Sequence, residues 1–60
     1  MKVSLTVINK HVMKWKKDQK HQRMGQYLMN QLVPKEVNST IFYEEDPDTA
    51  YKAFVAMYAE

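Results

Sequence analysis

A helix start at Asp46-Pro47-Asp48-Thr49 restricts the fold more than any other feature of the sequence. Aspartate is a preferred N-cap because its carboxylate accepts hydrogen bonds from backbone N–H groups that the first helical turn leaves free. Proline suits the first helical position, and a second aspartate adds negative charge near the positive end of the helix dipole. Four apolar residues then follow the spacing of one helical face: Tyr51, Phe54, Val55 and Tyr58. The segment is therefore predicted to form a helix over about residues 47–59 that packs against another apolar surface.

The N-terminal segment carries another apolar stripe, formed by Leu5, Ile8, Val12 and Trp15. This spacing predicts an amphipathic helix over about residues 5–17, with Ser4 or Thr6 as its cap. A strand over residues 3–8 is the alternative, because β-branched and polar residues alternate there. A single strand without a partner is hard to stabilise, so the helix is favoured.

A third stripe contains Met24, Tyr27, Leu28 and Leu32. It predicts a helix over about residues 22–33 that Pro34 ends, since the residue before a proline is pushed out of the helical region. In one continuous helix, at about 100° per residue, this stripe and the N-terminal stripe would face opposite sides. We therefore expect a break within Lys17–Gln22. A long helix shared between two chains is the alternative.

The stretch between the second and third predicted helices is turn-like, including Asn38-Ser39-Thr40, apart from the apolar Ile41-Phe42-Tyr43. We expect residues 38–46 to form a short irregular clasp that packs on the helices. The predicted fold is thus all-α, a small three-helix assembly in which residues 1–60 form one domain. A chain of 60 residues buries only about 60% of the surface of its unfolded state, so we expect marginal stability.

Several kinds of function lack support in the sequence. The absence of cysteine removes disulfides, thiolate metal sites and cysteine nucleophiles. Neither His11 nor His21 is followed by a carboxylate at i+3 or i+4 that would suggest a metal or catalytic pair, so they are expected to be ordinary surface histidines. The acidic residues at 44–48 lack the glycine and distant glutamate of a calcium loop. We expect no enzyme activity, no metal and no cofactor.

The N-terminal apolar stretch is too short and too polar for a signal peptide or a membrane span. We therefore expect an unprocessed, soluble and cytoplasmic protein without a membrane partner.

Charge divides the chain into two unlike halves. Residues 1–30 hold seven basic residues and one acidic residue, whereas residues 31–60 hold two basic and six acidic residues, giving +6 and −4. A basic helical face can follow phosphates, so a nucleic-acid-binding accessory protein is one hypothesis. Its candidate residues are Lys10, Lys14, Lys16, Lys17, Lys20 and Arg23. A solvated outer face is the commoner explanation of such a run, and Trp15 is expected to be core.

Aromatic residues support a different function. A domain this small cannot bury all its aromatic side chains, so some should form an exposed patch rimmed by charge, as protein-binding surfaces do. The favoured hypothesis is therefore a small protein-binding module. Its candidate residues are Phe42, Tyr43, Glu44, Glu45, Asp48 and Tyr51. Pairing of the oppositely charged halves between copies, as a homo-oligomer, is a third hypothesis.

A set of short motifs runs through the chain: Trp15, Lys20-His21-Gln22-Arg23-Met24-Gly25-Gln26, Asn30, Leu32, Phe42-Tyr43-Glu44 and Asp46-Pro47. They follow the pattern Arg-x-Gly-Gln, Asn-x-Leu and an acidic Phe-Tyr segment, and they resemble a group of very short helical proteins from phages and bacterial genomes. The resemblance implies a compact helical fold and a phage origin. Small phage proteins often act by binding a host protein, so the resemblance favours a phage-encoded modulator or inhibitor of a host protein, acting in the host cytoplasm. It also draws attention to Gly25, where we expect a close helix crossing under an aromatic residue of the C-terminal helix, because a helical glycine otherwise costs stability.

Overall fold

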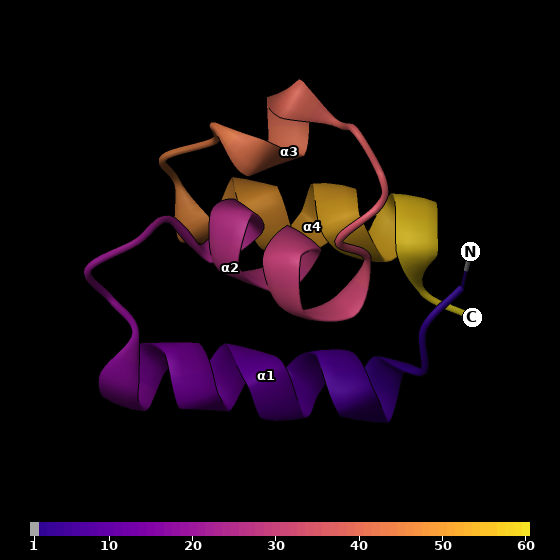
Figure 1. Cartoon of the computed structure of the whole chain (residues 1–60). Coiled ribbons are helices and arrows are strands. Elements are labelled where there is room, and N and C mark those ends of the chain that lie inside the picture. The colour runs from indigo at the N-terminus through magenta and orange to yellow at the C-terminus, as the bar shows by residue number, and fades with distance from the viewer. Residues whose placement is uncertain (1) are drawn as a thin grey trace.

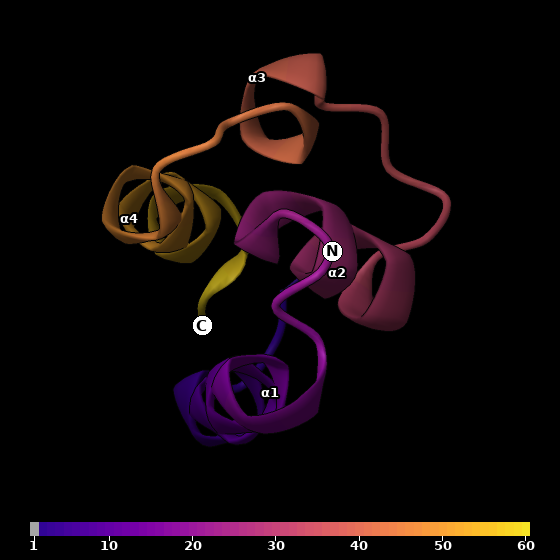
Figure 2. The ribbon, with the colours of Figure 1, turned by 90° about the vertical axis from the view of Figure 1, so that its left-hand side faces the viewer.

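The computed structural model describes residues 2–60, and within them the chain forms four helices. These are α1 (Leu5–Asp18), α2 (Met24–Leu32), α3 (Ser39–Phe42) and α4 (Pro47–Tyr58). Helix α1 runs along one side of α2, and α3 lies on the other side, next to α4 (Figures 1 and 2). The all-α class is confirmed, and the three long helices begin and end within two residues of the predicted positions.

The predicted break lies between α1 and α2, whose apolar stripes would face opposite sides of one continuous helix. Residues 19–23 are non-helical, and the Gln19 N–H closes α1 on the carbonyl oxygen of Trp15. The Trp15 indole N–H then donates to the carbonyl oxygen of Gln22 at 2.7 Å, which fixes the loop over the core. Trp15 is buried, as expected. Leu5, the first residue of the same stripe, is 44% exposed.

The prediction of a helix in the N-terminal segment is confirmed, and the strand alternative over residues 3–8 is wrong. The helix begins at Leu5, and Ser4 is its N-cap without a side-chain capping bond. Val3 forms a one-residue parallel bridge with Ala59, in which its N–H donates to the Tyr58 carbonyl at 2.6 Å. The two ends of the described chain therefore lie side by side (Figure 1).

The clasp at residues 38–46 is less irregular than expected, because it contains α3. Asn38 caps this one-turn helix, with its side-chain oxygen accepting from the Ile41 N–H at 3.2 Å. The interpretation of Asn38-Ser39-Thr40 as a simple turn is therefore wrong. A helix of four residues is too short to show a periodic apolar stripe, although asparagine is a preferred N-cap.

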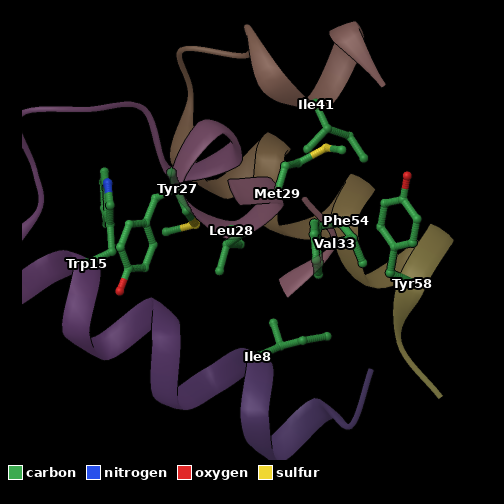
Figure 3. Close-up of a cluster of buried hydrophobic side chains, with 10 residues drawn as sticks. Ile8, Trp15, Tyr27, Leu28, Met29, Val33, Ile41, Phe54 and Tyr58 are labelled. Atoms are coloured by element: carbon green, nitrogen blue, oxygen red, sulfur yellow. The ribbon is translucent and has the colours of Figure 1, made fainter. Parts of the chain in front are cut away.

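Side chains from all four helices meet in one core (Figure 3). Ile41 enters it from α3, and Phe54 and Tyr58 enter it from α4, with ring centroids 4.9 Å apart. The buried cluster consists of Ile8, Trp15, Met24, Tyr27, Leu28, Met29, Val33, Ile41, Phe54 and Tyr58. The radius of gyration is 10.0 Å, close to the value of about 10 Å expected of a compact domain of this length.

Gly25 lies where α3 packs most closely on α2. A Cβ atom at this position would overlap the carbonyl oxygen of Ile41 and lie 2.9 Å from its carbonyl carbon. The expected close crossing is therefore confirmed. Its partner is the backbone of α3, and the expectation of an aromatic residue from the C-terminal helix is wrong.

The start of α4 has the predicted cap. The Asp48 N–H donates to the Asp46 carboxylate at 3.2 Å, and the Thr49 hydroxyl donates to the other carboxylate oxygen at 2.8 Å. Pro47 occupies the first turn.

Replacing Asp46 by alanine is expected to lower the free energy of unfolding by about 1 kcal/mol, because two donors lose their acceptor. Asp46→Asn keeps a capping oxygen and should stay closer to the wild type. Urea unfolding followed by circular dichroism measures both variants. An Asp46→Ala variant as stable as the wild type would mean that the cap does not stabilise α4.

Candidate protein-binding surface

The six residues predicted to bind a protein do not form one patch. Phe42 and Tyr43 line a depression beside α3, Glu45 lines a polar hollow at the start of α2, and Asp48 and Tyr51 line a groove beside α1. The chain turns sharply between α3 and α4, so residues close in sequence are directed to different sides of the domain.

The depression beside α3 is the most apolar of these places. It has a volume of about 290 Å³. Two of its residues are largely exposed, Val37 at 96% and Tyr43 at 64%. Phe42 is half-buried and packs edge-on against Tyr43, with ring centroids 5.0 Å apart. The lining residues are Met29, Glu36, Val37, Asn38, Ser39, Phe42 and Tyr43, and we call them the α3 surface.

Arg23 holds the end of α3 against the start of α2. Its Nε–H donates to the carbonyl oxygen of Phe42 at 3.3 Å, and its guanidinium lies 5.3 Å from the ring centroid of Tyr43. Cation–π contacts of this kind stabilise by about 0.5–1 kcal/mol at exposed sites. Together with Gly25, Arg23 gives the Arg-x-Gly-Gln motif a structural role: both residues attach α3 to α2.

A groove separates part of α1 from the start of α4. Its volume is about 450 Å³, and the Tyr51 hydroxyl crosses to α1 by donating to the Asn9 side-chain oxygen at 2.7 Å. Lys16 and Lys20 line it together with Asp48. The groove is therefore lined by residues of both the predicted protein-binding site and the predicted nucleic-acid-binding site, and it carries charges of both signs.

A polar hollow of about 570 Å³ lies over the loop that joins α1 and α2. Lys20, His21 and Arg23 line it together with Glu45. His21 is exposed, as expected, but His11 is half-buried, with its Nδ1 atom 2.9 Å from the Val7 carbonyl oxygen.

The six residues of the nucleic-acid hypothesis also separate. Lys16 and Lys20 line the groove between α1 and α4. The Arg23 side chain already contacts the Phe42 carbonyl oxygen and the Tyr43 ring. Lys10, Lys14 and Lys17 are exposed on α1. Met13 lies beside these three lysines and is 72% exposed. We call Lys10, Met13, Lys14 and Lys17 the outer α1 face.

Sequence reasoning missed Val37 and Met13 as surface residues. Val37 follows Pro34 in a polar loop and belongs to no apolar stripe. Met13 lies off the stripe of Ile8 and Trp15, at about 150° from its centre. The sequence signal for both residues was therefore that each is an apolar residue outside every helical stripe.

Within residues 2–60, no group of three His, Asp or Glu side chains is arranged to hold a metal ion. None of the described helices is long and apolar enough to span a bilayer. Comparison with protein-family models, with curated proteins and with solved structures finds no match to this chain.

Proposed function

We propose that this protein is a small binding module that engages another protein through the α3 surface, and that it acts by binding rather than by catalysis. The observation that supports this most directly is the exposure of Val37 and Tyr43 beside a shallow apolar depression. Aromatic and apolar side chains in a preformed hollow are the groups that dominate binding energy at protein interfaces. Arg23 and Gly25 hold this hollow in place, so little ordering would be needed when a partner binds.

The charges around the α3 surface define the chemistry of the partner. The carboxylate that lines the depression is that of Glu36, whose side chain is exposed. A partner segment should therefore carry an apolar side chain flanked by lysine or arginine, since complementary charge steers association and excludes wrong partners. The resemblance to short phage proteins makes a host protein in the cytoplasm the expected partner, which the module would modulate or inhibit by occupying its surface.

A nucleic-acid-binding function is the second candidate, and the outer α1 face favours it with three exposed lysines. The remaining cationic candidates weaken it. Lys16 and Lys20 share a groove with Asp48, and Arg23 and Glu45 line the same hollow. These carboxylates lower the positive potential that phosphate binding requires.

Selection of random peptides displayed against the immobilised protein tests the proposal. Enriched peptides should contain an apolar residue flanked by lysine or arginine. The double variant Val37→Lys/Tyr43→Ala should bind them at least about tenfold more weakly, because the apolar contacts and the charge complementarity are both lost. Met13→Lys, an apolar-to-lysine change at an exposed position on α1, is the matched control and should bind normally.

Two results would contradict the proposal. Peptides that bind Val37→Lys/Tyr43→Ala as tightly as the wild type would remove the α3 surface as the site. Failure to enrich any peptide, together with oligonucleotide binding that weakens steeply with added salt, would favour the nucleic-acid function instead.

A further inference from the structure

We infer that a second copy of this chain is one partner of the α3 surface, and that it docks through its outer α1 face. The inference rests on the proposed function, because it takes the α3 surface to be a protein-binding site. It adds the identity of one partner, which is a second copy of the same chain.

The outer α1 face has the chemistry expected of that partner. Ile8 and Trp15 point into the core, and at about 100° per residue the outer face lies more than about 100° away from them. Met13, an apolar side chain that is largely exposed, lies at one edge of this face. Lys10, Lys14 and Lys17 are exposed to one side of it, within about 100°.

The two surfaces complement each other in apolar contacts and in charge. Met13 is a flexible side chain whose sulfur makes favourable contacts with aromatic rings, and Phe42 and Tyr43 line the opposite depression. The lysines beside Met13 would face Glu36, the carboxylate that lines the α3 surface.

One copy cannot satisfy both surfaces by itself. Helices α1 and α3 lie on opposite sides of α2 in both views (Figures 1 and 2). Because the surfaces differ, the contact is heterologous, and each added copy leaves one surface of each kind free. The expected product is a head-to-tail chain. The interface is small and lined with exposed ion pairs, so association should be weak and should decrease as salt screens the charges.

Sedimentation equilibrium at low salt tests the inference with two variants that each damage one surface. Met13→Glu/Lys14→Glu alters the outer α1 face, and Val37→Lys/Tyr43→Ala alters the α3 surface. The wild type should associate progressively up to about 1 mM, and each variant alone should associate at least about tenfold more weakly. An equimolar mixture of the two variants should form a one-to-one dimer and nothing larger, because it contains one intact surface of each kind. Recovery in the mixture also shows that both variants are folded.

Different failures point to different errors. A wild type that stays monomeric up to about 1 mM while selected peptides still bind the α3 surface would overturn the self-association and leave the proposed function intact. Undiminished association of either variant alone would also overturn it, since copies would then pair through other residues. Loss of both self-association and peptide binding would contradict the two proposals together.

Discussion

Replacing Gly25 by alanine is expected to destabilise the domain by about 1–3 kcal/mol, which reverses the usual effect of this substitution in a helix. Alanine normally stabilises a helix interior by about 1 kcal/mol relative to glycine. At this position the added methyl group would overlap the backbone carbonyl of Ile41, and backbone cannot rotate away as a side chain can. Helix α3 must then move off α2, and the bond from Arg23 to the Phe42 carbonyl is stretched.

Chemical unfolding of Gly25→Ala beside the wild type measures this effect. Asn30→Ala is the matched control, since Asn30 is exposed on the same helix, and its stability should change by less than about 0.5 kcal/mol. A Gly25→Ala variant as stable as the wild type would mean that α3 does not pack on α2 at this distance.

Replacing Phe54 by alanine should leave about half of the protein or more unfolded at room temperature. The Phe54 side chain is fully buried and contacts the ring of Tyr58. Truncating a buried phenylalanine costs about 3–5 kcal/mol, because transfer energy is lost and a cavity remains. A domain of this size without disulfides or metal typically has a total stability of about 3–5 kcal/mol. The substitution therefore removes about as much free energy as the fold possesses.

Far-ultraviolet circular dichroism should show the loss of helical signal in Phe54→Ala. Phe54→Leu keeps most of the apolar volume and should retain a cooperative unfolding transition. Lys52→Ala, at an exposed position of α4, should resemble the wild type. Helical content and unfolding midpoint that are unchanged in Phe54→Ala would show that the fold does not depend on the burial of Phe54.

Local signals explain why the long helices could be predicted. The α4 boundary follows from the Asp46 cap and the apolar spacing of Phe54 and Tyr58, and both act within a few residues. The break after α1 follows from the opposed directions of two stripes. Periodicity indicates which face is apolar, but it does not show whether a partner covers that face, and Leu5 is exposed for this reason.

Tertiary contacts explain what the sequence did not reveal. Helix α3 is held by a close backbone approach at Gly25 and by Arg23, which come from a different part of the chain. The sequence prediction placed Arg23 on a phosphate-binding face because of its charge alone. Nothing in the neighbouring sequence indicates that its Nε–H donates to the Phe42 carbonyl oxygen. The aromatic and acidic residues predicted to form one patch lie in separate places for a similar reason, because contacts between distant parts of the chain set their positions. Only the placement of α3 shows that Val37 lies beside Tyr43, and only the placement of α4 shows that Tyr51 faces α1.

Nuclear magnetic resonance of the isotope-labelled protein, titrated with a selected peptide, tests the assignment of the α3 surface most directly. The account predicts that the largest amide shifts occur at Glu36–Tyr43 and at Arg23, which contacts Phe42 and Tyr43. At a protein concentration low enough and a salt concentration high enough to keep the protein monomeric, signals of the outer α1 face should move little when the peptide saturates the site. Shifts centred on Lys10–Lys17, or on the groove between Lys16 and Tyr51, would contradict the assignment and place the binding site elsewhere on the domain.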